Sequence, residues 1–423
     1  MSSQLWRGPS AAQGAADQVT ARALFRDREF RIYLIGQTTS GIGSALASVA
    51  LIFAVLSISH SASSLGLVLL ASRLPGVVLS LAGGVIADRW PRQRVAATAD
   101  LTRTALQACT GALLLSGDAT ILTLVLLQTL TGGANVIFGP AANALVAGVA
   151  PFGQVRRANS LLATTTSIAQ TAGLALSGAL VAIAGPGASF LVDSATFAVS
   201  SVCLILVRTR VVPVRDGRGM FRDLRDGWDA AIARGWVVVY AVHLTVINVL
   251  TLCPLFVLGP VVAERLGGAP AWSAIALGYA VGNIAAAQIT FRWAPRRPVL
   301  AAVTTSTGLA PLLALLGLAA PIWLIAPAAF MAGLQSTLYN TLIDSTMQSN
   351  LPDELLGRVG VVARIGSTLL VPIGMGLCGV LATNIGAATV LLAAAIIVLA
   401  AAAAAACCPA GYARLGLNRI PAR

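Results

Sequence analysis

The feature that most limits what this chain can fold into is its series of long apolar stretches. Twelve such runs, each of about 20 residues or more, follow one another along the chain. A helix of about 20 apolar residues crosses the hydrocarbon core of a bilayer, where no water satisfies open backbone groups. The sequence therefore predicts an all-α membrane protein with twelve transmembrane helices. The predicted spans are 32–57, 65–87, 95–116, 120–148, 160–184, 187–207, 237–262, 271–292, 299–319, 322–345, 358–382 and 385–406.

Composition agrees with this fold class and excludes others. The 423 residues are 57% hydrophobic and 10% charged, with a mean hydropathy of +0.85, whereas soluble domains carry about 25% charged residues. The net charge of +13 raises nucleic-acid binding, but the basic residues are confined mainly to short segments between apolar runs. The sequence shows no metal-ligand spacing, phosphate loop or nucleophile motif. We expect no enzyme activity, no metal, no cofactor and no nucleic-acid partner.

The distribution of arginine predicts the orientation in the membrane. All 28 basic residues are arginine, and 24 lie in the two tails and the alternate loops that share one side of the predicted bundle. The loops of the other side hold only Arg265. Because arginine accumulates in cytoplasmic loops, we expect a multi-pass protein of the cytoplasmic (inner) membrane with both termini in the cytoplasm.

An internal repeat appears when the chain is shifted by 201 residues. Seven special residues then superimpose, and the fourth and fifth spans fall on the tenth and eleventh. Such a shift is typical of two six-helix halves in the same orientation, a parallel repeat. The matched pairs are Gly132 with Gly333, Phe138 with Tyr339, Pro151 with Pro352, Arg157 with Arg358, Gly173 with Gly374, Gly178 with Gly379, and Gly185 with Gly386.

These spans set the predicted domain boundaries. Between the two bundles, the apolar residues from Phe221 to Ile232 fall on one helical stripe, which predicts an amphipathic helix on the membrane surface or against the bundle. The predicted units are a disordered cytoplasmic tail (1–23), an N-terminal six-helix bundle (24–207), a cytoplasmic linker (208–236), a C-terminal six-helix bundle (237–406) and a cytoplasmic tail (407–423).

The loop between the second and third spans has a mechanical interpretation. It reads GVIADRWPRQR from Gly84 to Arg94. Gly84 allows a close approach of two helices, and Asp88 can lie against the positive N-terminal end of a neighbouring helix. Arg89 and Arg92 hold the loop on the cytoplasmic side. The alternative is an ordinary basic loop between two membrane helices.

This loop resembles the G-x-x-x-D-R-x-x-R signature of major facilitator superfamily transporters, with Pro91 where that family usually has glycine or another residue. The resemblance implies a conformational latch. In it, Asp88 would meet the start of the eleventh span, near Gly357 and Arg358, in the outward-facing state.

Other segments are similar to one branch of that superfamily, which includes macrolide-efflux-like and enterobactin-exporter-like proteins. The similarity extends over about residues 24–400 and implies export, without specifying a substrate. The segments are LFRDREFR (24–31) followed by GQ (36–37), RLP (73–75), DLTR (100–103), RANS (157–160), FLVD (190–193) and QSNLPDELLGR (348–358).

The chain departs from related drug–proton antiporters in two places. The fourth span has no arginine in its stretch QTLTG (128–132), and Gly173 of the fifth span is followed by Leu174 rather than proline. If transport is coupled to protons, other groups must carry them.

Charged residues inside membrane spans are costly and therefore point to function. The candidates for a proton or charge relay are Arg73, Asp100, Arg103 and Asp193. Asp100 and Arg103 are three residues apart and share a helix face. A purely structural pair is an equal alternative for these two, as is structural capping for Asp193.

Polar, uncharged residues on the spans suggest a central substrate cavity. Hydrogen bonds between helices explain each of them singly, but as a set they indicate an amphiphilic and largely uncharged cavity. The candidates are Gln37, Ser40, Ser44, Asn135, Gln170, Asn248, Asn283 and Gln335.

Together these features predict a secondary active transporter that works by alternating access. We expect proton-coupled export, as in a multidrug efflux antiporter, of a hydrophobic or amphiphilic small molecule such as a drug, a secondary metabolite or a siderophore. The alternatives are a small-molecule importer and a transport-inactive membrane scaffold or receptor of the same fold.

Overall fold

The computed structural model describes residues 24–82, 91–151, 153–209, 220–290, 295 and 298–407, and all regular secondary structure in these segments is helical. The helices are α2 (Arg28–Ser59), α3 (Ala62–Ala82), α4 (Arg92–Ser116), α5 (Ile121–Val149), α6 (Val155–Leu206), α7 (Met220–Ile232), α8 (Gly235–Leu266), α9 (Ala269–Thr290), α10 (Pro298–Thr305), the 3₁₀ turn η1 (Ser306–Leu309), α11 (Ala310–Gly317), α12 (Ile322–Asn350), α13 (Asp353–Ile385) and α14 (Ala387–Cys407).

These helices make the twelve passes that the sequence predicts. Seven helices within the described segments are long and apolar enough to cross a membrane, and shorter apolar helices lie in α3, in α10–α11 and in α14. The 52-residue α6 contributes two passes. The remaining pass is α4, which is less apolar because it carries Asp100, Arg103 and Gln107. The predicted fold class is confirmed.

Two interruptions of the helices have local causes. Gly185 in α6 has φ 77° and ψ 170°, a conformation open to glycine, and Pro186 follows it. The chain turns there without a separate loop. Between α10 and α11, Pro311 cannot donate a backbone hydrogen bond to the preceding turn, and the chain forms the 3₁₀ segment η1.

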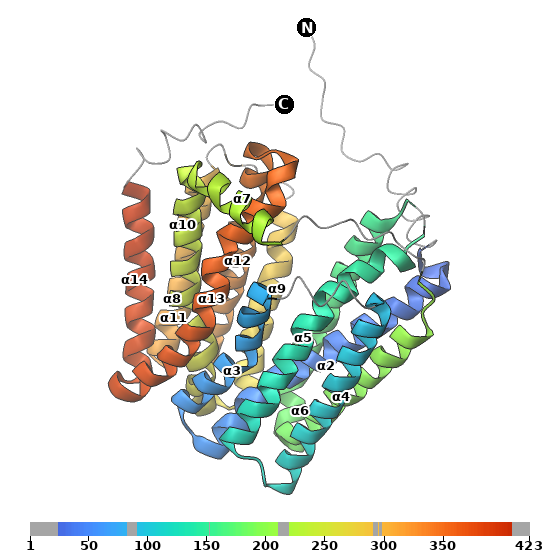
Figure 1. The fold of residues 1–423 in the computed structure, drawn as a ribbon. Coiled ribbons are helices and arrows are strands. Elements are labelled where there is room, and N and C mark those ends of the chain that lie inside the picture. Colours follow the sequence, from blue (N-terminus) through green and yellow to red (C-terminus); the bar gives the residue numbers. More distant parts are fainter. Residues whose placement is uncertain are drawn as a thin grey trace.

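The passes form two bundles, α2–α6 and α8–α14, with α7 lying across one end of the second bundle (Figure 1). The halves meet where α3 packs on α13 and where α6 packs on α9. In Figure 1 the two bundles diverge toward the end that carries α7, here called the α7 end. The halves are therefore joined mainly at the opposite end.

Glycine allows the close approach of the halves at this opposite end. A Cβ atom on Gly379 of α13 would lie 2.5 Å from the carbonyl oxygen of Ala62 and 2.8 Å from Cα of Ser63, both in α3. One on Gly178 of α6 would lie 2.8 Å from Cα of Pro270 in α9. Small residues at such positions let membrane helices pack backbone to backbone.

Polar contacts also join the two halves at this end, here called the closed end. Ser177 of α6 and Ser273 of α9 are buried, and their hydroxyl oxygens lie 2.9 Å apart in a hydrogen bond. His60, which follows α2, lies 3.5 Å from the carboxylate of Glu264 near the end of α8. Both contacts join the two halves.

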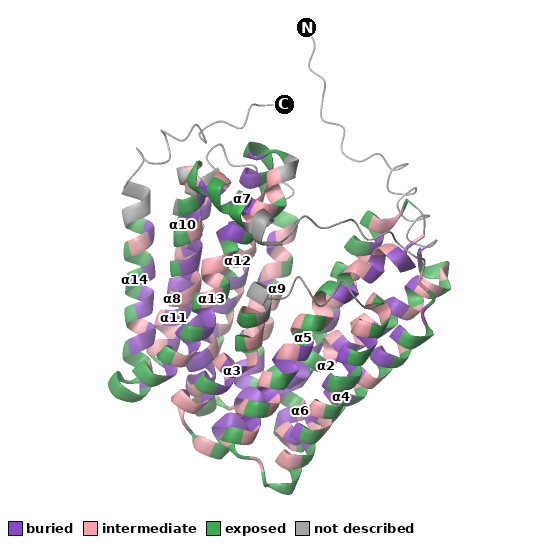
Figure 2. Ribbon diagram, viewed as in Figure 1, coloured by how far each residue is buried: buried purple, intermediate pink, exposed green. Residues whose placement is uncertain are grey.

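The outer surface of the bundle is apolar, as a lipid-facing surface must be. Figure 2 shows exposed residues along the outer faces of the helices. Ile183 is 86% exposed and Trp323 is 69% exposed. Exposed apolar side chains on this scale are unfavourable in water, but they are expected where lipid surrounds the protein.

The amphipathic helix expected between the halves corresponds to α7. It packs against α13, and a Cβ on Gly227 would lie 2.8 Å from the carbonyl oxygen of Arg358. Trp228 and Ile232, which directly follow the buried Gly227 and Ala231, remain exposed. α12 and α13 are longer than their predicted spans because polar helical turns continue to Asn350 and begin at Asp353.

A disulfide across the closed end should lock this conformation. In a chain whose six native cysteines are replaced, Ser177→Cys with Ser273→Cys should crosslink on oxidation, because the two side-chain oxygens are already in contact. Transport should stop on oxidation and return on reduction, measured as flux into vesicles. Each single cysteine variant is the control, and a crosslinked protein that still transports would contradict the assignment of this contact to one conformational state.

Candidate functional site

A cavity of about 760 Å³ lies between the two halves. The N-terminal half contributes α2, α3 and the first pass of α6, and the C-terminal half contributes α8, α9 and α11–α13. It is lined from Trp272 near the closed end to Thr164 and Gln288 toward the α7 end. Its polar lining residues are Ser48, Arg73, Thr164, Ser167, Gln170, Thr171, Tyr279, Asn283, Gln288 and Thr337.

The eight predicted cavity residues divide into two groups. Gln170 and Asn283 line the cavity. Asn135 and Asn248 instead bind partners within their own halves: Asn135 accepts a hydrogen bond from Arg103 at 3.1 Å, and Asn248 donates one to Ser367 at 2.7 Å. Gln37, Ser40, Ser44 and Gln335 are also not among the lining residues.

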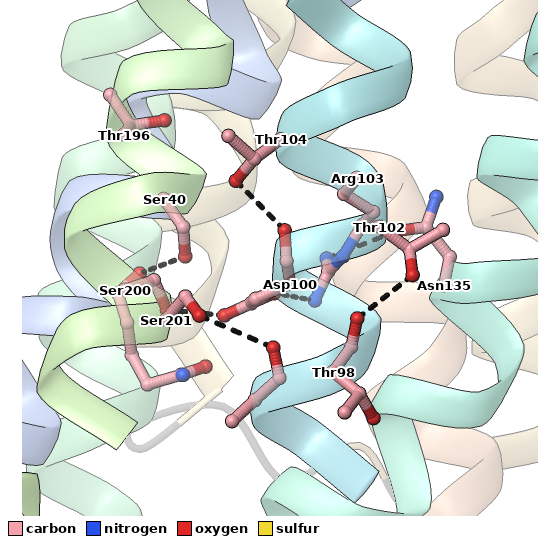
Figure 3. A network of polar contacts seen from close by, with 12 residues as sticks. Ser40, Thr98, Asp100, Thr102, Arg103, Thr104, Asn135, Thr196, Ser200 and Ser201 are labelled. Atoms are coloured by element: carbon pink, nitrogen blue, oxygen red, sulfur yellow. Dashed lines mark hydrogen bonds and ion pairs between the residues drawn. The ribbon is translucent and has the colours of Figure 1, made fainter. Parts of the chain in front are cut away.

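A second polar site lies inside the N-terminal bundle (Figure 3), and its residues are not among those that line the cavity. Its centre is the ion pair between Arg103 and Asp100 on α4. The other oxygen of Asp100 accepts a hydrogen bond from Ser200 of α6 at 2.6 Å. We call Asp100, Arg103, Gln107, Asn135, Asp193 and Ser200 the Arg103 cluster.

Two aromatic rings enclose the guanidinium of Arg103. Its central carbon lies 3.8 Å from the ring centroid of Phe138 on α5 and 4.4 Å from that of Phe197 on α6. Ring faces attract a cation, and the attraction is strongest where water is excluded. Because Arg103 is only 5% exposed, the rings and Asp100 replace the water that it would otherwise bind.

Asp193 is the second carboxylate of the cluster and is fully buried. It accepts hydrogen bonds from the Gln107 amide at 2.7 Å and from the Thr196 hydroxyl at 3.4 Å. No ion pair joins it to any described residue. Two carboxylates therefore share a pocket with one arginine, and the arrangement is uncharged only when one of the carboxylates holds a proton.

The local sequence explains how the cluster assembles. On α4, Gln107 follows Arg103 by four residues and Asp100 by seven, so all three face the same side. On α6, Phe197 and Ser200 follow Asp193 by four and seven residues in the same way. This spacing was the available signal for Gln107, Phe197 and Ser200, which the sequence analysis missed.

The remaining predicted residues lie elsewhere. Arg73 of α3 lines the cavity. Of the latch residues, Gly84, Asp88 and Arg89 fall outside the described residues, while Arg92 begins α4. Gly357 and Arg358 lie in the early turns of α13, where α7 packs.

A family model described as Major Facilitator Superfamily matches residues 33–370. The chain belongs to the Major Facilitator Superfamily. It is a multi-pass membrane transporter, and members of this superfamily are generally not enzymes.

Individual relatives agree with this membership. The chain is 25% identical over 389 residues to the uncharacterized MFS-type transporter YfiS of Bacillus subtilis (strain 168), covering 87% of this chain and 90% of that protein.

Solved structures share the fold. The nucleoside transporter NupG, as a mutant, matches with a TM-score of 0.71 at 11% identity, over 89% of this chain and 98% of that one. A bacterial homologue of the iron transporter ferroportin, in an inward-facing state, matches with a TM-score of 0.67 at 16% identity, over 89% and 98%. A bacterial homologue of the lysosomal transporter Spinster, inward-facing and unoccupied, gives 0.65 at 15%, over 94% and 99%.

The pairing within the Arg103 cluster predicts a non-additive effect on stability. Arg103→Met should lower the free energy of unfolding by about 3–5 kcal/mol, because it leaves Asp100 buried without its cation. Adding Asp100→Asn should recover most of that loss. Thermal unfolding in detergent measures both, and a double variant no more stable than Arg103→Met would show that the pair is not the stabilising contact.

Proposed function

We propose that this superfamily transporter exports a hydrophobic or amphiphilic small molecule from the cytoplasm by alternating access, driven by the proton gradient. The observation that carries the proposal is the cavity, which is lined by both halves and lies between a closed end and a divergent α7 end. A binding site shared by two rigid halves can be exposed to one side at a time as they rock.

The arginine distribution supports a cytoplasmic location for the α7 end and for both termini. The conformation would then be inward-open, a state in which a substrate enters from the cytoplasm. Two of the structures with the same fold are also described as inward-facing. The segments similar to the macrolide-efflux and enterobactin-exporter branch favour export of a drug-like molecule, a secondary metabolite or a siderophore.

The Arg103 cluster is the proposed site of proton coupling. Asp100 is already paired with Arg103, so Asp193 is the carboxylate of the cluster that forms no ion pair with a described residue. Proton binding to Asp193 would neutralise the cluster, and proton loss would leave an uncompensated negative charge inside the bundle. That change can bias how α4, α5 and α6 pack and thereby which conformation is favoured.

The loop after α3 is the proposed latch for the opposite, outward-open state. There Asp88 would approach the start of α13 near Gly357 and Arg358, with Gly84, Arg89 and Arg92 shaping the loop. α7 packs against this part of α13 in the present conformation.

A flux measurement tests the proposal. Inverted membrane vesicles that contain the full chain would be given a panel of amphiphilic compounds, with and without a protonophore that dissipates the proton gradient. We expect gradient-dependent accumulation of at least one compound. Gradient-driven loss from preloaded inverted vesicles would indicate import, and no flux of any compound would favour a transport-inactive scaffold.

The proton site yields a sharper prediction. Asp193→Asn fixes the side chain in a neutral form, so flux of a transported compound should continue down its own gradient but lose its response to the proton gradient. Asp118→Asn, which changes an exposed acid between α4 and α5, is the matched control and should behave as the wild type. Full gradient-driven transport by Asp193→Asn at equal expression would exclude Asp193 as the coupling group.

A further inference from the structure

The cavity contains a positively charged side chain, which a binding site for uncharged molecules does not require. Among the described residues that line it, Arg73 alone carries a charge. It lies in the middle of α3, and its side chain is exposed rather than packed away. No described carboxylate forms an ion pair with it, in contrast to Arg103 and Arg364, which pair with Asp100 and Asp344.

An unpaired guanidinium is costly in the interior of a membrane protein. In the open state water can reach it through the cavity, but water is lost as the cavity closes. A ligand with an anionic group would then replace that water, and guanidinium binds a carboxylate through two parallel hydrogen bonds. A cationic ligand would be repelled at the same point.

The other polar lining residues differ in what they can donate to a ligand. The hydroxyls of Ser48 and Thr171 donate to backbone carbonyls of their own helices, at 2.7 and 2.9 Å. Thr337 donates to the amide oxygen of Asn283 at 3.1 Å, which leaves the Asn283 NH₂ group as the free end of that side chain. The Asn283 amide and the Arg73 guanidinium therefore present N–H groups to the cavity.

Another part of the lining is aromatic. Phe256 of α8 and Trp272 of α9 make an edge-to-face contact with their ring centroids 6.4 Å apart, and Ile275 and Tyr279 extend this surface along α9. These residues belong to the C-terminal half, whereas Arg73 belongs to the N-terminal half. The cationic and aromatic parts of the cavity are thus on different halves.

We propose that the cavity selects amphiphilic carboxylic acids, with the carboxylate on Arg73 and an aromatic or apolar body against Phe256 and Trp272. The inference rests on the proposed role of the cavity as the substrate site and specifies the substrate class. A bound molecule of this kind contacts both halves at once, so its binding is linked directly to their closure.

Two probes of equal shape test the proposal: dansylglycine, which carries a carboxylate, and dansylglycinamide, its neutral amide. Binding to the purified full chain in lipid nanodiscs is followed by energy transfer from tryptophan to the dansyl group. We expect the wild type to bind the acid at least about tenfold more tightly than the amide, as a charge-assisted hydrogen bond provides.

Variants separate charge from shape. Arg73→Gln should weaken the binding of dansylglycine but not of dansylglycinamide, and thereby remove the preference for the acid. Arg73→Lys should retain part of the preference, because it keeps the positive charge but not the planar guanidinium that binds a carboxylate through two hydrogen bonds. Arg156→Gln, which removes an exposed arginine at the start of α6, is the control and should keep the full preference.

The outcomes distinguish this inference from the proposed function. Equal affinity for the two probes, or a preference that survives in Arg73→Gln, would overturn the carboxylate inference. If neither probe binds while an uncharged compound of the flux panel is transported, the inference is wrong and the transporter proposal stands. If the acid preference depends on Arg73 but no compound, including dansylglycine, is transported, the binding inference stands and the transport proposal fails.

Discussion

A charged side chain in the hydrocarbon core of a membrane must be paired, hydrated or neutralised, and this requirement governs the interior of the protein. Arg103 is paired with Asp100 and enclosed by Phe138 and Phe197. Asp193 is held by amide and hydroxyl donors without a cation of its own. Arg73 is placed where the cavity admits water or a ligand. In our proposal, the Arg103 cluster binds a proton and Arg73 binds an anion.

The internal repeat places glycines at equivalent contacts and turns in the two halves. Gly178 and Gly379, which the repeat relates, each allow a helix of one half to approach the other half, on α9 and on α3 respectively. Gly185 and Gly386 both have positive φ, where the chain turns between consecutive passes. Two equivalent contacts at one end form a natural pivot, and the cavity lies on the side where the bundles separate. Rocking about that pivot would change access by moving one bundle against the other.

Much of the fold could be predicted because span length and arginine placement are local properties of the sequence. The pairing of Asp100 with Arg103 is local as well, since three residues separate them on one helix. That Phe138 and Asp193 join this pair depends on how α5 and α6 pack against α4, which periodicity does not specify. The cavity lining was harder to predict for the same reason. Asn135 and Asn248 have the same chemistry as Asn283, but they are used for contacts between helices of one half. Trp272 belongs to the buried core and also lines the cavity, and this second role could not be predicted until α9 was placed.

The central claim is that the two ends of the bundle open in alternation around one cavity. Spin labels on Arg94 and Ser349 report the separation of the halves at the α7 end, and labels on Ser116 and Leu318 report it at the opposite end; all four positions are exposed. Pulsed electron paramagnetic resonance in lipid nanodiscs then gives the distance distribution of each pair across a range of pH and with a transported compound. The account predicts that any condition that shortens the first distance lengthens the second. Distances that change together, or that stay fixed at both ends under every condition, would contradict it.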